Sequence, residues 1–147
     1  MKALIQRVTE ASVTIDGEEV AAIGEGYLVL FSVTHDDTEK KVDEIARKTL
    51  ALRIFEDDAG KTNRSLLDVG GSVIVVSQFT LYADTTHGNR PGFSNAARPE
   101  LAEPLYERYV ARLKETLGAE RVGTGRFGAD MKVRLLNDGP FTVELEL

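Results

Sequence analysis

Apolar and polar residues alternate along much of the chain, and this alternation predicts strands in its first and last parts. Residues 2–33 are predicted to form four short strands, with turns at Asp16-Gly17 and at residues 24–26. Residues 53–55 predict a further short strand. The unbroken apolar run in residues 72–76 is typical of a strand buried on both faces, and it therefore predicts the centre of a sheet.

Two segments show the spacing of amphipathic helices instead. One begins after Thr38, a residue suited to a helix N-cap, and the other covers residues 100–117 and ends before Gly118. Strands combined with two such helices predict an α+β fold in which the helices pack on a sheet. The apolar stripes expected in the core are Val42, Ile45, Ala46, Thr49 and Leu50 in the first helix, and Leu101, Leu105, Tyr109, Leu113 and Leu117 in the second.

Composition restricts the possible classes of function. The 147 residues, 42% of them hydrophobic, suffice for one domain with a core, and the net charge is -6. No apolar run approaches the roughly 20 residues that cross a bilayer, and no signal peptide is evident, so we expect a cytoplasmic protein that does not engage membranes. The absence of cysteine excludes disulfides and thiolate nucleophiles. The negative charge argues against a protein that binds along DNA or a long stretch of RNA, but it does not exclude binding to one end of an RNA.

Three patterns suggest chemistry that their surroundings do not support. Residues 123–128, GTGRFG, match the dinucleotide-binding fingerprint, but a predicted helix precedes them and a strand follows, so we interpret them as a connecting loop. His87 with Asp84 and Ser94 could form a hydrolytic triad, but no nucleophile elbow accompanies them. His35 and the aspartates after it lack a second cluster of ligands, and we predict no metal site and no cofactor.

Two further stretches are more informative. SQFTLYAD, residues 77–84, follows the predicted central strand directly; taken alone, it favours a structural role in which Ser77 and Thr80 bond the local backbone and Phe79 packs inward. NDGP, residues 137–140, has the composition of a hairpin turn, yet its proline cannot donate to the ladder of a following strand. Something other than a tight turn is therefore expected there.

SQFTLYAD together with NDGPFT resembles the D-aminoacyl-tRNA deacylases, and the resemblance spans the whole chain. The other stretches that resemble this family are, in order, MKALIQRVTEASVTIDG, GYLVLFSVTHDDTE, RIFEDDAGK, GGSVIVV, RPGFS, LAEPLYERYV and TGRFGADM. Two positions depart from the family pattern: Gly92 stands where serine is frequent, and Ser32 where glycine is usual. These departures concern local loop contacts.

The resemblance implies a homodimer of layered α/β/β fold, with one deacylase domain over residues 1–147 that hydrolyses the ester of D-aminoacyl-tRNA. It implies a cis bond between Gly139 and Pro140, and a dipeptide that Arg7 orients and that reaches into the partner's active site. Two parallel carbonyls there would accept from the α-ammonium group, while the backbone would exclude an L side chain sterically. Glycine has no side chain to exclude, so glycyl-tRNA mischarged on tRNA-Ala is an expected substrate.

The resemblance also assigns the catalytic segment to Ser77, Gln78, Phe79 and Thr80. The backbone N–H groups of Phe79 and Thr80 are candidate donors to the developing oxyanion. Thr80 is the obvious nucleophile, but no histidine or lysine is evidently placed to activate its hydroxyl. We therefore favour assistance by the 2′-OH of the terminal adenosine of the tRNA.

The expected partners are the 3′ end and acceptor stem of an aminoacyl-tRNA, contacted by Arg90, Lys132 or Arg134. Two alternatives remain open. A homologue of relaxed chirality would have a trans Gly139-Pro140 bond and act on mischarged L-aminoacyl-tRNA. A non-catalytic module would bind RNA 3′ ends or nucleotides without turnover.

Overall fold

A long, bent strand, β1 (Lys2–Ile15), organises the sheet in this computed structural model, which describes residues 1–147. The second long strand, β8 (Lys132–Glu146), runs antiparallel along one edge of β1. The remaining elements are, in chain order, β2 (Glu18–Ile23), β3 (Gly26–Ser32), α1 (Glu39–Ala51), β4 (Arg53–Glu56), β5 (Thr62–Ser65), β6 (Ser72–Ser77), the 3-10 turn η1 (Phe79–Tyr82), α2 (Pro99–Leu117), the 3-10 turn η2 (Ala119–Arg121) and β7 (Val122–Thr124).

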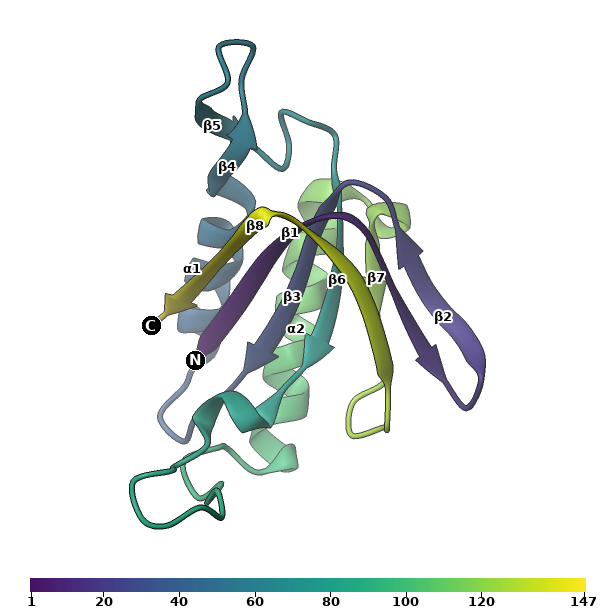
Figure 1. Cartoon of the computed structure of the whole chain (residues 1–147). Helices are drawn as coiled ribbons and strands as arrows, with labels where there is room; N and C mark the ends of the chain where they lie inside the picture. The colour runs from purple at the N-terminus through teal and green to yellow at the C-terminus, as the bar shows by residue number, and fades with distance from the viewer.

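Strand β1 arches over the molecule (Figure 1), so the two halves of its other edge pair with different strands. Its first half pairs antiparallel with β3 and its second half with β2. From β3 the sheet continues through β6 and β7 as parallel strands. It curls until β2 lies beside β7, where a Cβ built on Gly123 would stand 3.0 Å from the Cβ of Ala21. The result is a mixed, nearly closed barrel.

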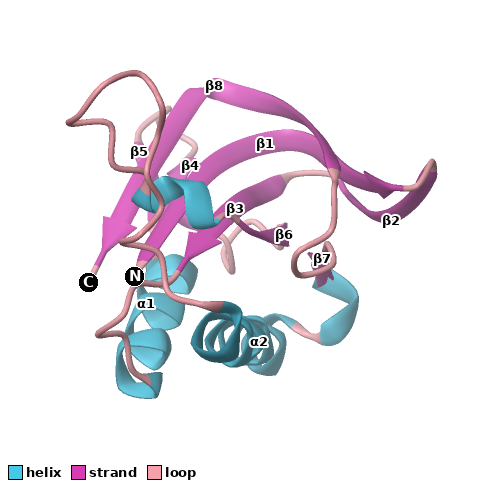
Figure 2. Cartoon of the chain, turned by 90° about the horizontal axis from the view of Figure 1, so that it is seen from below, coloured by secondary structure: helices cyan, strands magenta, loops and turns pink.

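Apolar side chains on the two faces of the sheet form separate clusters. Both helices cover one face (Figure 2), where the ring of Phe31 stacks on that of Tyr109 with centroids 4.3 Å apart. The hydroxyls of Tyr109 and Thr49 lie 2.8 Å apart, so each of these two buried hydroxyls has a hydrogen-bond partner. The face away from the helices buries Val8, Ala11, Val13, Ile15, Leu28, Ile74 and Val76.

Most of the predicted elements are confirmed. Both helices form, residues 53–55 lie in β4, and residues 72–76 form a buried strand between β3 and β7. The α+β class and the packing of the helices on one side of a mixed sheet are also confirmed. None of the helices combines the length and apolar character needed to span a membrane.

Two details of the prediction are wrong. Residues 2–33 form three strands and not four, because β1 runs unbroken through the exposed pair Thr9 and Glu10. These residues interrupt the apolar alternation where β1 and β8 shift register, so the break marks an irregularity inside a strand and not a turn. Leu101, expected in the core, is 36% exposed at the start of α2.

Candidate active site

The SQFT segment lies where β6 ends, beside the end of β3. The N–H of Gln78 donates to the carbonyl of Phe31 at 2.8 Å, just after β6 ends at Ser77. The chain then enters η1, and the side-chain amide of Gln78 donates to the hydroxyl of Thr80 at 2.5 Å. The ring of Phe79 is 57% exposed and does not pack inward. Phe79 and Thr80 therefore lie at the surface, whereas Ser77 and Gln78 are half-buried.

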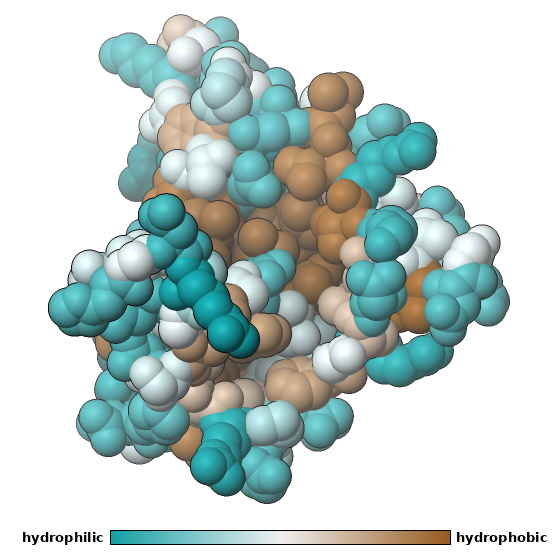
Figure 3. Space-filling view, turned by 60° about the horizontal axis from the view of Figure 1, so that its bottom comes forward, coloured by the Kyte–Doolittle hydropathy of each residue, from teal (hydrophilic) through white to brown (hydrophobic).

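A cavity of about 640 Å³ opens beside SQFT. Its wall is formed by the ends of β3 and β6, the start of α2 and two loops, residues 93–99 and 127–131. The rings of Phe79 and Phe93 meet edge to face with centroids 5.0 Å apart. A cavity of this size suits a ligand the size of a nucleoside, and exposed aromatic rings are common stacking partners of unpaired bases. Figure 3 shows an apolar, hollowed centre with a hydrophilic rim on the face seen from this end.

The loop of residues 93–99 is tied to the sheet through residues around His35. The hydroxyl of Thr34 donates to the carbonyl of Asn95 at 2.6 Å, and Nε2 of His35 lies 2.6 Å from the carbonyl oxygen of Ser94. His35 thus helps hold the loop that carries Phe93 at the cavity. This contact gives it a structural role close to the site.

The triad considered from the sequence does not assemble around Asp84. Its carboxylate accepts from the N–H of Thr86 at 2.9 Å and from the Thr86 hydroxyl at 2.6 Å. These hydrogen bonds hold the pKa of Asp84 below its usual range. Ser94 contributes only its backbone carbonyl, to His35. The hydrogen bonds of these residues therefore serve loop structure.

Neither the hydrogen-bond partner of Thr80 nor the phenol of Tyr106 can act as a general base. The hydroxyl of Thr80 has the Gln78 amide as its hydrogen-bond partner, and an amide does not take up a proton. Tyr106, in the cavity wall, donates its hydroxyl to the carbonyl of Val75 at 2.9 Å. Burial raises the pKa of Tyr106 to about 12, so this phenol stays protonated near neutral pH.

Sequence reasoning missed several residues that line the cavity. Phe93 comes from RPGFS, and Phe127 and Met131 come from the GTGRFG loop and the residues after it. Residues 125–128 form the expected connector, whereas Gly123 and Thr124 belong to β7, and the connector also closes one side of the cavity. Arg98 and Asp130 are the charged residues of the wall. The aromatic residue in each Gly-rich loop was the available signal.

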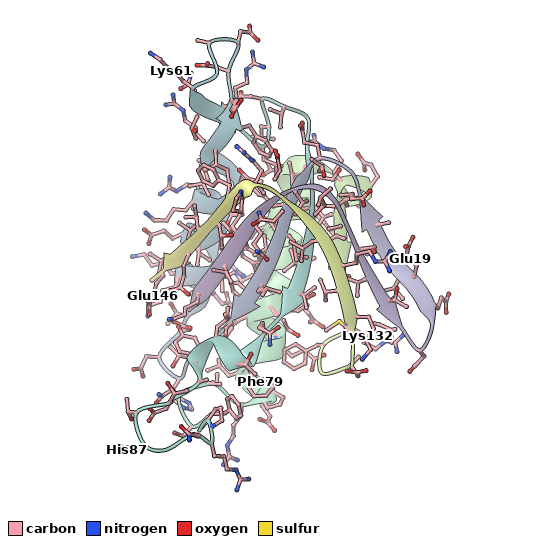
Figure 4. All side chains as sticks on the ribbon, viewed as in Figure 1. Glu19, Lys61, Phe79, His87, Lys132 and Glu146 are labelled. Atoms are coloured by element: carbon pink, nitrogen blue, oxygen red, sulfur yellow. The ribbon has the colours of Figure 1, made fainter.

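The residues predicted to contact tRNA lie at different distances from the cavity. Lys132 and Arg134 are exposed on β8 and alternate with Met131 and Val133, which line the cavity. Figure 4 shows Lys132 at the same end of the sheet as Phe79. Arg90 lies in an exposed loop and is not part of the wall.

The NDGP segment forms a bulge inside β8, not a hairpin. Asn137 pairs with Val8 and Thr142 pairs with Gln6, so residues 138–141, called the bulge below, lie opposite Arg7 alone. The peptide bond between Gly139 and Pro140 is cis. Gly139 has a φ of +127°, and a Cβ built on it would stand 3.0 Å from the N of Phe141. Only glycine suits this position without strain.

Arg7 lies on β1 opposite the bulge and is only 7% exposed. Its guanidinium donates to the carbonyl of Ile54 at 2.5 Å and to the carbonyl of Asp138 at 3.2 Å. It also lies 4.9 Å from the centroid of the Phe141 ring. Arg7 thus links β1, β4 and the bulge.

SQFT and the bulge are far apart within one chain. Arg7, opposite the bulge, pairs with Tyr27 near the start of β3, whereas Gln78 bonds Phe31 near its end. At roughly 3.3 Å per residue, these two levels of β3 are about 13 Å apart. The bend in β8 and the turn η1 accordingly lie toward opposite ends of the sheet in Figure 1. One chain does not bring the two motifs into one site.

Comparison with known proteins identifies the family. The profile of the family described as D-Tyr-tRNA(Tyr) deacylase matches residues 4–146. The chain belongs to this deacylase family. Proteins named D-aminoacyl-tRNA deacylase from Marinobacter nauticus (57% identical, covering 99% of this chain and 94% of that one) and Ruegeria pomeroyi (56% identical, covering 100% of both) are among its relatives.

Two solved structures share the fold of this chain. One, titled c-Myc DNA Unwinding Element Binding Protein, has a TM-score of 0.94 and 44% identity, and covers 100% of this deacylase and 99% of that chain. Another, titled as a probable eukaryotic D-amino acid tRNA deacylase, has a TM-score of 0.88 at 17% identity, covers 99% of this chain and 98% of that one, and shows the fold alone. The resemblance found in the sequence is confirmed, and the protein is a hydrolase of the deacylase type.

Proposed function

We propose that this deacylase hydrolyses the ester of D-aminoacyl-tRNA, with the terminal adenosine in the cavity beside SQFT. The observation that carries the proposal is the cavity itself: it is about 640 Å³ in volume and lined by Phe79, Phe93 and Phe127, with Ser77 and Gln78 of SQFT also in its wall. Aromatic rings suit an unpaired base, and a segment rich in backbone donors suits the ester. Family membership supports the same substrate class.

The oxyanion formed during hydrolysis would be bound by the N–H groups of Phe79 and Thr80. These groups open the 3-10 turn η1, and the bonds of such a turn run from each N–H to the carbonyl three residues back. The first bond of this kind is from Leu81 to the carbonyl of Gln78, which leaves the two preceding N–H groups without a partner inside the turn. Preorganised N–H groups of this kind stabilise developing negative charge strongly.

The hydroxyl that assists the reaction would come from the substrate. Thr80 bonds the Gln78 amide, and an unactivated hydroxyl is a weak nucleophile. The 2′-OH of the terminal ribose lies beside the ester carbonyl, where it would orient the attacking water. The water oxygen would then form the new bond to the carbonyl carbon as the bond to the ribose oxygen breaks, and the proton of the water would pass to that leaving oxygen. The protein would then supply position and oxyanion binding, with Gln78 holding Thr80 in place.

Chiral selection would come from the bulge of a second copy of the chain. Asp138, Gly139 and Pro140 are exposed, and the bulge lies about 13 Å along the sheet from SQFT of its own chain. A homodimer that brings the bulge of one copy to SQFT of the other would complete the site. Backbone carbonyls would bind the α-ammonium, and an L side chain would collide with the Gly139-Pro140 backbone, whereas glycyl-tRNA and D-aminoacyl-tRNA would fit.

The tRNA would be held mainly at its 3′ end. Arg98 belongs to the cavity wall and is the cation best placed to meet the terminal phosphates, whereas Lys132 and Arg134 project from the opposite face of β8 to the wall residue Val133 and would contact a more distant part of the acceptor stem. Few phosphate contacts suit a chain with a net charge of -6. Binding should consequently depend only weakly on salt.

The direct test is release of amino acid from matched D-tyrosyl-, L-tyrosyl- and glycyl-tRNA at catalytic enzyme concentration. Release of D-tyrosine and glycine but not L-tyrosine is the expected result. Equal release of both tyrosine enantiomers would favour a homologue of relaxed chirality. Binding of charged and uncharged tRNA without turnover would favour a binding module, and the DNA-binding title of one relative makes single-stranded DNA a useful competitor in that assay.

The cross-subunit site can be tested by complementation. Gly139→Val should inactivate one half of each site, and Phe79→Pro, which removes an N–H, the other half. If two chains build each site, mixing the two inactive variants under subunit exchange should restore activity, because each hybrid dimer contains one intact pair of halves. Absence of recovery despite hybrid formation would contradict the two-chain site.

A further inference from the structure

The bulge removes several hydrogen bonds that an antiparallel ladder would otherwise supply. Residues 138–141 stand opposite Arg7 alone, so the backbone carbonyls of Arg7 and Phe141 lose their regular partners. Unpaired carbonyls at a partly buried position are costly, and a bulge without other support would be free to shift.

Asn137 supplies the missing donors. Its side-chain amide donates to the carbonyl of Arg7 at 2.8 Å and to the carbonyl of Phe141 at 3.0 Å, and both contacts are partly buried. Its amide oxygen accepts from the hydroxyl of Thr142 at 3.4 Å. One side chain at the first end of the bulge therefore joins the opposite strand to the last residue of the bulge.

We propose that Asn137 is a positioning residue for chiral selection. Its side-chain amide fixes the Gly139-Pro140 backbone by bonding across the bulge, and the guanidinium of Arg7 supports the start of the bulge. This inference rests on the proposed role of the bulge. The two supports are complementary, because Arg7 holds the carbonyl of Asp138 at the start and Asn137 holds the carbonyl of Phe141 at the end. Gly139 and Pro140 lie between these points.

The proposal explains why an amide occupies this position. Two carbonyl acceptors must be bonded by one short side chain, and asparagine carries two N–H donors on one nitrogen. Aspartate has the same shape but, when ionised, only accepts hydrogen bonds, and it would face two carbonyl oxygens. Steric rejection of an L side chain depends on where the backbone stands, and errors of about 1 Å at such sites change rates by about a hundredfold.

The test compares Asn137→Ala and Asn137→Asp with wild type and with the control Gln6→Ala. The half-buried Gln6 contacts the same Thr142 hydroxyl at 3.5 Å, but it does not span the bulge. Rates are measured for D-tyrosyl- and L-tyrosyl-tRNA, and thermal unfolding is followed in parallel. We expect both Asn137 variants to lower the ratio of D to L hydrolysis by about ten- to a hundredfold, chiefly through faster release of L-tyrosine. Gln6→Ala should keep the wild-type ratio.

The outcomes separate the inference from the proposed function. If Asn137 had a merely structural role, its variants would have a lower unfolding temperature and would hydrolyse both substrates more slowly by the same factor. An unchanged D-to-L ratio in the variants would overturn the inference. The proposed function would still stand if the wild-type enzyme distinguished the two enantiomers. The uncharged alanine variant keeps the test decisive if the aspartate variant, which places a carboxylate against two carbonyl oxygens, does not fold. A wild-type enzyme that fails to distinguish the two enantiomers would overturn both.

Discussion

Replacing Arg7 by alanine should destabilise the fold by about 3–5 kcal/mol. The guanidinium is 7% exposed and donates to two carbonyls, those of Ile54 and Asp138. Hydrogen bonds to charged groups contribute about 1.5–3 kcal/mol each, and the contact with the Phe141 ring adds about 0.5–1 kcal/mol, which together give about 3.5–7 kcal/mol. Losses above about 5 kcal/mol are exceptional for a single substitution, so the expected range is the lower part, about 3–5 kcal/mol. The ion pair with the Asp138 carboxylate, at 3.3 Å, adds little because that side chain is half exposed.

The assay is equilibrium unfolding in urea, followed by circular dichroism, with thermal unfolding beside it. For a domain of this length, a loss of about 3–5 kcal/mol corresponds to a fall of roughly 6–20 °C in unfolding temperature. Arg7→Lys is the matched variant: it keeps the charge but cannot reach both carbonyls in a planar fork, so it should lose part of the stability. Arg47→Ala, at an exposed position of α1, serves as the control and should stay within about 0.5 kcal/mol of wild type.

A loss below about 1 kcal/mol for Arg7→Ala would refute the reasoning. It would mean that the carbonyls of Ile54 and Asp138 are satisfied without the guanidinium, and that the bulge does not depend on Arg7. Such a result would also weaken the assignment of Arg7 as the residue that orients Gly139 and Pro140.

Three further predictions follow from other parts of the structure. Thr80→Ala should retain most of the deacylase activity, whereas a substrate ending in 2′-deoxyadenosine should lose it; the reverse pattern would make Thr80 the nucleophile. Ser32→Ala should raise the urea midpoint slightly, because the buried Ser32 hydroxyl has no hydrogen-bond partner, and a loss of stability would reveal a contact that it makes. Asp43 accepts hydrogen bonds from Arg108 and Arg112, and these hydrogen bonds lower the pKa of its carboxyl in the folded state. The contribution of Asp43 to stability is therefore present above the unfolded pKa of about 3.9 and is lost as the pH falls through the lower pKa of the folded state. The stability difference between wild type and Asp43→Asn should therefore be full near pH 7 and shrink at acidic pH below about 4, and a constant difference across that range would contradict the ion-pair origin.

Local pattern determined the elements that depend on nearby residues. The helix after Thr38 begins as predicted because the Thr38 hydroxyl accepts from the N–H of Lys41 at 3.4 Å, a contact within one turn of chain. The central strand at residues 72–76 was predictable because its side chains are buried on both faces, which the unbroken apolar run already requires. The path of β1 was not predictable, because alternation does not distinguish a bend from a turn at Thr9 and Glu10.

The sequence by itself determined the family and singled out SQFT and Gly139-Pro140, since a whole-chain resemblance and two short motifs are properties of residue order. Only the tertiary structure decided what these motifs contact. The curl of the sheet brings Phe93 and Phe127 from separate loops to the same cavity, and the pairing of β8 with β1 makes NDGP a bulge clamped by Arg7 and Asn137. Contacts between residues as far apart in sequence as Asn137 and Arg7, which are 130 positions apart, depend on strand register, and register is set by the packing of the whole sheet.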